Sequence, residues 1–401
     1  MTERLRIENL TKIFGEKPER AQRILAAGGN KKRVFDELGV VVGLNNVSLK
    51  VLEGSTYVVM GLSGSGKSTL ARCVNRLNEP TSGRILLDGL DIMELDERDL
   101  RQLRRTRLSM VFQHFALLPN KRVIENVEFG LKLRGVLPKQ RRARAHEVLA
   151  VVGLAQWHLH YPHELSGGMR QRVGLARALA TDADVLIMDE AFSALDPLIR
   201  SEMQEELLRL QQTLRKTIIF ITHDFQEALK IGTRIAIMSE GEVVREGTPQ
   251  SIVLDPGSDY IAAFTREVDR ARLFDARSAM GQVCTLLEVP QGTVVGAMNE
   301  ADGPAFVVDG ERRVIGSLTG AELRAARTSG TIGTPDGKFI CVSDSARLVH
   351  VARSYREGRP IGVVDADGRL IGILDAEQIL SRIATTAHSS VNSGAHDAAG
   401  R

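Results

Sequence analysis

The chain has 401 residues, of which 43% are hydrophobic and 26% charged, a composition that is ordinary for a soluble globular protein of about two or three domains. Its net charge of +3 is too small to indicate a nucleic-acid binder, and 4% aromatic residues exclude a stacking platform for single-stranded nucleic acid. No apolar stretch approaches the roughly 20 residues that cross a bilayer, and the first residues lack the apolar region of a signal peptide, so we expect a cytosolic protein.

Residues 15–42 are the first segment with a pattern of its own. They carry the basic side chains that are typical of the solvated face of surface helices, namely Arg20, Arg23, Lys31, Lys32 and Arg33. We interpret the segment as a helical excursion on the surface, and its role stays open.

Residues 61–69 fit the pattern G-x-x-x-x-G-K-[ST] and follow the apolar run 57–60, which predicts a buried strand. The glycines let backbone N–H groups turn toward phosphate oxygens, and a helix starting near Gly66 adds the positive end of its dipole. Lys67 is expected to reach the β- and γ-phosphates and Ser68 to coordinate Mg²⁺, while Thr69 binds a phosphate oxygen or caps the turn. The candidate ATP-binding residues of this loop are Gly61, Ser63, Gly64, Ser65, Gly66, Lys67, Ser68 and Thr69.

A pair of glycines opens a predicted helix farther along the chain, in the stretch Ser166-Gly167-Gly168-Met169. A serine hydroxyl, glycine N–H groups and a helix N-terminus together form a second candidate anion site. Taken alone, the same residues would also fit an ordinary helix cap.

Residues 184–190 place four apolar side chains before two carboxylates, which predicts a central strand with acids at its carboxyl end. That end of an open α/β sheet faces the ligand crevice. Asp189 is therefore expected to hold the Mg²⁺ shell, and Glu190 to accept the proton of an attacking water. The alternative, an acidic strand end that caps the next helix, is weak beside a P-loop.

The carboxyl-terminal third repeats itself after a predicted hairpin at 235–245. Residues 304–318 align with 360–374 at an offset of 56, and each copy predicts a strand, a turn, a second strand and a helix. The last residues, 385–401, are small and polar and predict a disordered tail.

The order of these motifs resembles that of the ATP-binding cassette (ABC) ATPases, with Met169 in place of the usual Gln of the LSGGQ signature. The resemblance implies an α/β fold: a RecA-like P-loop NTPase core with an antiparallel β subdomain and a helical subdomain. It further implies that Gln113 contacts Mg²⁺ and the lytic water, that Asp196 of the D-loop crosses a dimer interface and that His223 contacts the γ-phosphate. Phe14 would stack on adenine, although a lone phenylalanine is more often a core residue.

The same resemblance implies a composite site. Two chains stack head to tail and enclose two ATP molecules, each with Mg²⁺, between the P-loop of one chain and residues 166–169 of the other. A single chain is then expected to hydrolyse ATP poorly.

Within this family, residues 6–270 are most similar to the ATPases of glycine betaine/proline betaine importers of the quaternary-amine type. The stretches 13–44, 164–177 and 188–200 carry that similarity, and most cassette ATPases lack the segment 15–42. It implies a peripheral protein on the cytoplasmic face of the inner membrane that energises uptake with a membrane permease and, indirectly, a substrate-binding protein. Choline, carnitine or an amino acid is the alternative cargo. A soluble ABC ATPase acting on nucleic acid or the ribosome would show two fused cassettes or a coiled-coil insertion, and the sequence has neither.

The repeated third resembles a tandem pair of cystathionine-β-synthase (CBS) regulatory modules, with copies at about 279–327 and 337–384. A nucleotide or an anionic lipid is a possible ligand, and a purely structural dimerisation module is the alternative. The expected domains are thus 1–270 for the ATPase, 279–384 for the CBS module and 385–401 for the tail.

Overall fold

Two units make up the chain, residues 1–262 and 263–401. The computed structural model describes residues 2–112, 116–193, 195–289, 292–297, 305–329, 331, 339–356 and 361–384. Of the expected site residues, Gln113 lies outside the described residues.

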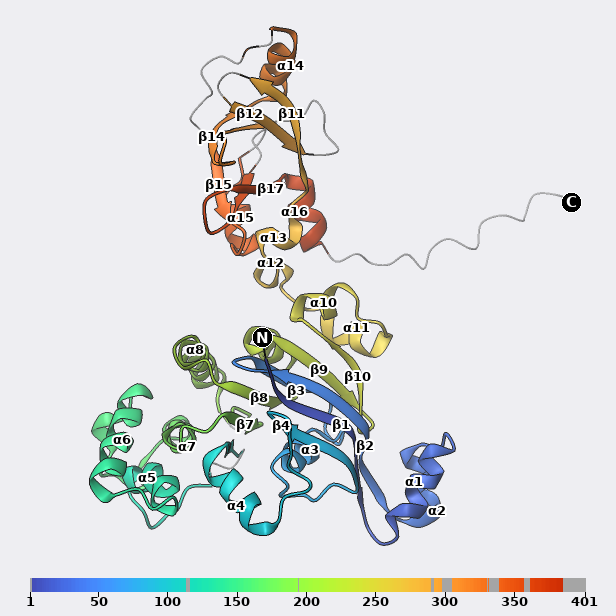
Figure 1. Cartoon of the computed structure of the whole chain (residues 1–401), viewed down its shortest axis with the longest axis vertical. Coiled ribbons are helices and arrows are strands. Elements are labelled where there is room, and N and C mark those ends of the chain that lie inside the picture. Colours follow the sequence, from blue (N-terminus) through green and yellow to red (C-terminus); the bar gives the residue numbers. More distant parts are fainter. Residues whose placement is uncertain are drawn as a thin grey trace, which may run out of the picture. The chain divides into compact units, whose positions relative to one another are not determined.

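A six-stranded sheet in the order β10-β9-β3-β8-β7-β6 forms one layer of unit 1 (Figure 1). Its strands pair in parallel, except for the antiparallel hairpin of β9 and β10. Strands β3, β7 and β8 are buried along their whole length, which explains why their sequences are continuous apolar runs. The bounds are Thr56–Met60 for β3, Leu108–Val111 for β6, Val185–Asp189 for β7, Thr217–Thr222 for β8, Arg234–Ser239 for β9 and Glu242–Gly247 for β10.

A second, antiparallel sheet of unit 1 has the order β2-β1-β4-β5. Its strands are β1 (Glu3–Phe14), β2 (Val41–Leu52), β4 (Ser82–Leu87) and β5 (Leu90–Asp91). Because only one face of the sheet is buried, β2 alternates between buried and exposed residues toward its end.

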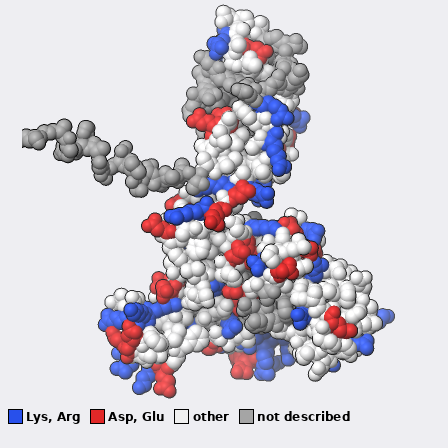
Figure 2. Space-filling model, turned by 180° about the vertical axis from the view of Figure 1, so that it is seen from behind, with Lys and Arg blue, Asp and Glu red and all other residues white. Residues whose placement is uncertain are grey.

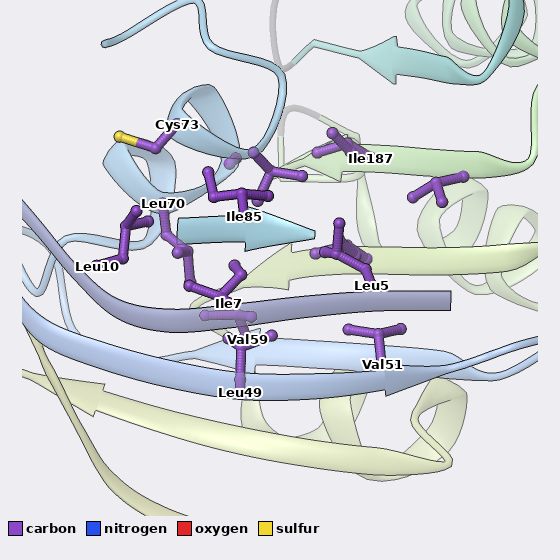
Figure 3. Close-up of a cluster of buried hydrophobic side chains, with 14 of the residues drawn as sticks. Leu5, Ile7, Leu10, Leu49, Val51, Val59, Leu70, Cys73, Ile85 and Ile187 are labelled. Carbon is purple, nitrogen blue, oxygen red and sulfur yellow. The ribbon is translucent and has the colours of Figure 1, made fainter. Parts of the chain in front are cut away.

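The main hydrophobic core joins the two sheets and helix α3 (Lys67–Val74), as Figure 3 shows. Leu5 and Ile7 of the antiparallel sheet, Val59 and Ile187 of the parallel sheet, and Leu70 of the helix all belong to it. The helix that starts directly after the glycine-rich loop is therefore fixed from both sides by apolar packing.

Helices α5, α6 and α7 pack against one another and form a helical group of their own (Figure 1). Two further helices, α1 and α2, lie in the chain between β1 and β2, in the segment that the sequence analysis singled out. The helices of unit 1 are α1 (Pro18–Ala26), α2 (Lys31–Leu38), α4 (Glu97–Thr106), α5 (Val123–Leu133), α6 (Pro138–Val151), η1 (Ala155–Trp157), η2 (Pro162–Glu164), α7 (Gly167–Ala180), α8 (Pro197–Leu214), α9 (Phe225–Ile231) and α10 (Pro249–Leu254), and α11 (Asp259–Thr265) runs across the unit boundary.

Unit 2 contains two sheets, in the orders β11-β12-β13-β14 and β15-β16-β17. Its strands are β11 (Val283–Val289), β12 (Gly292–Ala297), β13 (Ala305–Val308), β14 (Val314–Leu318), β15 (Ile340–Ser343), β16 (Ile361–Val364) and β17 (Leu370–Leu374). Its helices are α12 (Arg270–Leu273), α13 (Ala276–Ala279), α14 (Gly320–Ser329), α15 (Leu348–Ser354) and α16 (Ala376–Ile383).

The internal repeat is visible in both the elements and the turns of unit 2. The pairs β13/β16 and β14/β17 have bounds that differ by the offset of 56, and α14 and α16 begin at the same offset. The turns also match, because Asp309 Oδ1 accepts from the backbone N–H of Arg313 and Asp365 Oδ1 accepts from that of Arg369. Asp309 and Asp365 thus stabilise equivalent turns in the two copies.

The two copies differ in the strand before this shared part. In the second copy, β15 runs parallel to β16 and helix α15 connects them. In the first copy, β11 and β12 form an antiparallel hairpin that continues antiparallel into β13. A hairpin needs no crossover helix, so the start of the first copy has a different topology from the start of the second.

The boundary between the units lies earlier than the expected limits of 270 and 279. Helices α12 and α13 bond to the second copy: Leu348 N donates to Phe274 O at 2.9 Å and Ala276 N to Ala346 O at 2.8 Å. These backbone bonds join residues 274–276 to unit 2, which spans residues 263–401.

Surface charges of both signs are interspersed on the face that Figure 2 shows. In the parts of the chain that the structure describes, no helix combines the length and the apolar character that crossing a membrane requires.

The core of unit 1 generates a stability prediction. Leu70 is 1% exposed in the main cluster, so Leu70→Ala should lower the free energy of unfolding by about 2–5 kcal/mol. Leu77, which is 52% exposed, is the matched control. Leu77→Ala should change the free energy of unfolding by less than about 0.5 kcal/mol. Urea denaturation measures both, and equal effects of the two substitutions would contradict this description of the core.

Candidate nucleotide-binding site

The glycine-rich loop lies between the end of β3 and the start of α3, and its backbone passes close to other segments. A Cβ atom on Gly61 would lie 2.2 Å from Met238 O, and one on Gly66 would lie 2.5 Å from Gly43 O. Gly66 also has a φ of +103°, which L side chains rarely adopt, and it is the N-cap residue of α3. Glycine is thus required at these positions both by conformation and by space.

Lys67 is buried directly behind this loop. Its Nζ donates hydrogen bonds to Gly61 O at 2.8 Å and to Leu62 O at 2.9 Å. Burial lowers the pKa of Lys67, while the carboxylates of Glu190 and Asp189 act in the opposite direction. The ammonium group is therefore held at the loop, where it can bind the phosphates of a nucleotide.

Ser68 and Asp189 meet at the carboxyl end of β7. Ser68 Oγ donates to Asp189 Oδ1 at 2.8 Å, although the two residues are 121 positions apart. Burial raises the pKa of the Asp189 carboxyl, and the hydrogen bond from Ser68 opposes that shift. A hydroxyl and a carboxylate are oxygen ligands that suit Mg²⁺, which otherwise keeps water and takes substrate phosphates as ligands.

Glu190 follows Asp189 and has a left-handed backbone with a φ of +46°. Its N–H donates to Ile221 O of β8 at 3.0 Å, and its carbonyl oxygen accepts from Ser193 Oγ at 2.9 Å. Its side chain lies beside His223, with 3.4 Å between Oε2 and Nδ1. The parallel pairing of β7 and β8 brings these two residues together at one edge of the sheet.

A pocket of about 530 Å³ opens over the glycine-rich loop. At one end it is lined by Ser63, Gly64, Gly66, Lys67, Ser68, Thr69 and Glu190. Phe14 lines it as well, together with residues 40–43 of β2. The structure thus brings Phe14 and most of the expected phosphate-binding residues into one pocket, whereas Gly61 and Ser65 do not line it.

Helix α2 also lines this pocket, through Lys31, Lys32 and Phe35. Two of the basic residues that were expected on a solvated surface, Lys31 and Lys32, therefore lie at the site. The available signal was the spacing of Lys31 and Phe35, which at i and i+4 share one face of a helix.

The signature residues lie elsewhere. Ser166 is the N-cap residue of α7, and its Oγ accepts from Met169 N at 3.3 Å. Gly168 lies against α8, because a Cβ atom there would be 2.4 Å from Ile199 Cγ2. Asp196 is the N-cap residue of α8, with Oδ1 accepting from the backbone N–H groups of Leu198 and Ile199. Residues 166–169 and Asp196 are not among the described residues that line the pocket of the same chain.

No group of three or more His, Cys, Asp or Glu side chains suited to a metal ion occurs among the described residues. The described pair that offers oxygen ligands next to the phosphate loop is Ser68 and Asp189.

Comparison with known proteins places these motifs in context. A family profile described as ABC transporter matches residues 44–193, which include the glycine-rich loop and strand β7. The glycine betaine/proline betaine transport system ATP-binding protein ProV of Escherichia coli is 52% identical over 277 residues, which cover 69% of each chain. The glycine betaine transport ATP-binding protein OpuAA of Bacillus subtilis is 42% identical over 372 residues, which cover 91% of this chain and 89% of OpuAA.

A solved structure shares the fold of the cassette. The ATP-binding cassette MJ0796, in a dimeric post-hydrolysis state bound to ADP and Pi, superposes with a TM-score of 0.52 at 33% sequence identity. The match covers 61% of this chain and 98% of that one.

The buried carboxyl of Asp189 generates a pH prediction. Its raised pKa means that the folded state binds the proton more tightly than the unfolded chain does, so stability falls as the pH rises above the ordinary value of 3.8. Asp189→Asn should therefore increase the free energy of unfolding at pH 7.5, and the gain over the wild type should shrink toward pH 4.

Denaturant titrations at several pH values measure this effect. Asp182, whose side chain is exposed, is the control, and Asp182→Asn should change stability by less than about 0.5 kcal/mol. If Asp189→Asn were less stable than the wild type at pH 7.5, the ionised carboxylate of Asp189 would not destabilise the folded state.

Proposed function

This chain belongs to the ATP-hydrolysing proteins of ABC transporters, and we propose that its hydrolysis of ATP drives the import of an osmoprotectant such as glycine betaine or proline betaine. The cargo rests on the 52% identity to a glycine betaine/proline betaine transport protein and on the 42% identity to a glycine betaine transport protein over nearly the whole chain. The cargo itself would be bound by other subunits, so no residue of this chain needs to contact it.

One observation carries the chemistry: a single pocket is lined by the phosphate loop and by Glu190, with the Ser68–Asp189 pair beside it. Lys67 and the loop N–H groups bind and neutralise the phosphates. Ser68 and Asp189, together with Gln113, would hold Mg²⁺, and the ion would supply charge neutralisation for phosphoryl transfer. Phe14 stacks on the adenine base.

Glu190 is the general base of the proposed reaction. It lies at the open end of β7, 3.4 Å from His223, and it lines the pocket near the phosphate loop. Glu190 accepts a proton from the attacking water, and His223 contacts the γ-phosphate and helps to orient it.

The complete site needs two chains. Ser166 presents the amino-terminal end of α7 at a place that is not part of its own chain's described pocket lining. In a head-to-tail homodimer, residues 166–169 would bind the γ-phosphate held by the partner, and Asp196 would cross the interface. The dimeric cassette bound to ADP and Pi, with which this chain shares its fold, supports this arrangement.

The proposed partners follow from the same assignment. The ATPase dimer binds an integral membrane permease on the cytoplasmic face of the inner membrane, and a substrate-binding protein delivers the cargo. Unit 2 acts as a CBS-type regulatory module with a nucleotide or an anionic lipid as its ligand. A decisive test is to purify the chain with its permease in lipid and to measure ATP turnover with the binding protein and candidate cargoes. Stimulation by an amino acid but not by betaines would overturn the cargo assignment.

Glu190→Gln should lower ATP turnover by about 10²–10⁴-fold, because the amide cannot accept the proton, while ATP affinity stays near the wild-type value. The measurements are phosphate release and equilibrium ATP binding, with light scattering to detect a trapped dimer. Glu205→Gln, which changes an exposed glutamate paired with Lys230, is the control and should keep wild-type turnover. Turnover within about tenfold of the wild type in Glu190→Gln would exclude this residue as the base.

We further propose that unit 2 senses ionic conditions and adjusts ATP turnover to them, which predicts a separate outcome. Removal of residues 267–401 cuts after α11 and leaves the elements of unit 1 intact. The truncated importer should still hydrolyse ATP, but its turnover in lipid should no longer depend on ionic strength. An unchanged salt response would contradict the regulatory role and leave the ATPase assignment untouched.

A further inference from the structure

Helices α1 and α2 are anchored at the end of the β1–β2 hairpin, where Phe14 pairs with Val41 (Figure 1). Ala21 and Val34 of these helices pack in a small cluster with Ile13, Val40 and Val42 of the two strands. Helix α2 has defined ends: Asn30 Oδ1 accepts from Arg33 N at 2.9 Å, and Gly39 follows the helix with a φ of +68°. The position of α2 is therefore fixed by packing and capping.

The face of α2 that lines the pocket combines an exposed aromatic ring with two ammonium groups. Phe35 is 56% exposed and Phe14 is 39% exposed, and both line the same pocket. Among the described residues, the one other exposed phenylalanine is Phe129, at 37%. Two of three exposed rings thus lie where a flat heteroaromatic base could cover them.

Lys31 connects this helix to the phosphate loop. Its Cε and Nζ lie against Gly241, since a Cβ atom there would be 2.9 Å and 3.1 Å away from them. Gly241 N in turn donates to Ser65 O of the loop at 3.0 Å. Burial lowers the pKa of Lys31, while the carboxylates of Glu240 and Glu242 raise it. Helix α2 is thus held next to the loop through the turn between β9 and β10.

We propose that α2 is a second wall of the nucleotide site, in which Phe35 packs on the purine base opposite or beside Phe14 and Lys32 attracts the phosphates. This inference rests on the proposed function as an ATPase and adds to it a specific role for the segment 15–42. The segment thereby contributes to affinity for the base, in addition to the contact expected from Phe14.

The test compares two ligands on the full-length chain: Mg–ATP, and inorganic tripolyphosphate, which has the phosphates without the base. Phe35→Ala should weaken ATP binding by about tenfold, as expected for the loss of a stacked ring, and leave tripolyphosphate binding unchanged. Phe35→Tyr, which keeps a ring, should restore ATP binding. Lys32→Glu should weaken the binding of both ligands severalfold, because it reverses a charge in the lining of the pocket.

Arg33→Ala is the matched control, because Arg33 lies on the same helix, pairs with Glu37 at 2.6 Å and is not among the residues that line the pocket. It should leave the affinity for both ligands unchanged. Thermal unfolding verifies that each variant is folded, which is expected for Phe35→Ala because the ring is largely exposed.

Lys67→Ala distinguishes the nucleotide site itself from the role of α2, since it should weaken the binding of both ATP and tripolyphosphate. If Lys67→Ala still binds ATP like the wild type, the proposed nucleotide site is wrong. If Lys67→Ala loses binding while Phe35→Ala binds ATP normally, only the role of α2 is overturned. A loss of tripolyphosphate binding in Phe35→Ala would also overturn it, because Phe35 would then support the loop rather than contact the base.

Discussion

The backbone of the glycine-rich loop is in direct contact with three other segments, and this close approach organises unit 1. Gly61 faces Met238 O of the parallel sheet, and Gly66 faces Gly43 O of the antiparallel sheet. Ser65 O accepts from Gly241 N in the turn between β9 and β10. A side chain at Gly61 would clash with β9 and one at Gly66 would clash with β2, so the loop that can hold phosphates also packs closely against both sheets.

The charged residues that suit the site to bind a nucleotide also lower the stability of the fold. Lys67 and Asp189 are both buried. Burial lowers the pKa of Lys67 and raises the pKa of Asp189, because it disfavours the charged form of each side chain. If the site had no charged ligand to bind, apolar side chains at these two positions would make the fold more stable. The core around Leu70 and Ile187, which packs both sheets against α3, provides the stability that tolerates these charges.

Short motifs with a local mechanism could be predicted from the sequence, and long-range packing could not. The glycine spacing predicted the loop at 61–69 and a helix that starts near Gly66, and the apolar run before Asp189 predicted strand β7. The offset of 56 predicted the elements β13, β14, β16 and β17, because turn and strand patterns are local. The Ser68–Asp189 contact followed once both motifs were placed on one sheet.

Other features lay beyond such patterns. Lys31 and Lys32 have the same composition as a solvated helix face, and only the cluster around Val34 shows that α2 lines the pocket. The antiparallel start of the first repeat depends on which strand β12 pairs with, and its β-branched sequence suits either direction. The early unit boundary depends on backbone bonds from residues 274–276 to residues 346–348, far along the chain.

The matching turns of unit 2 also connect its two copies. Asp309 and Asp365 make the same side-chain hydrogen bond 56 residues apart, and Arg313 and Arg369 form a bridge between the two copies at equivalent positions. Two equivalent positions that pair with each other relate the two copies by an approximate two-fold arrangement, as in an isologous interface. The copies therefore meet at their shared turns, although the strand before β13 and the strand before β16 have different topologies.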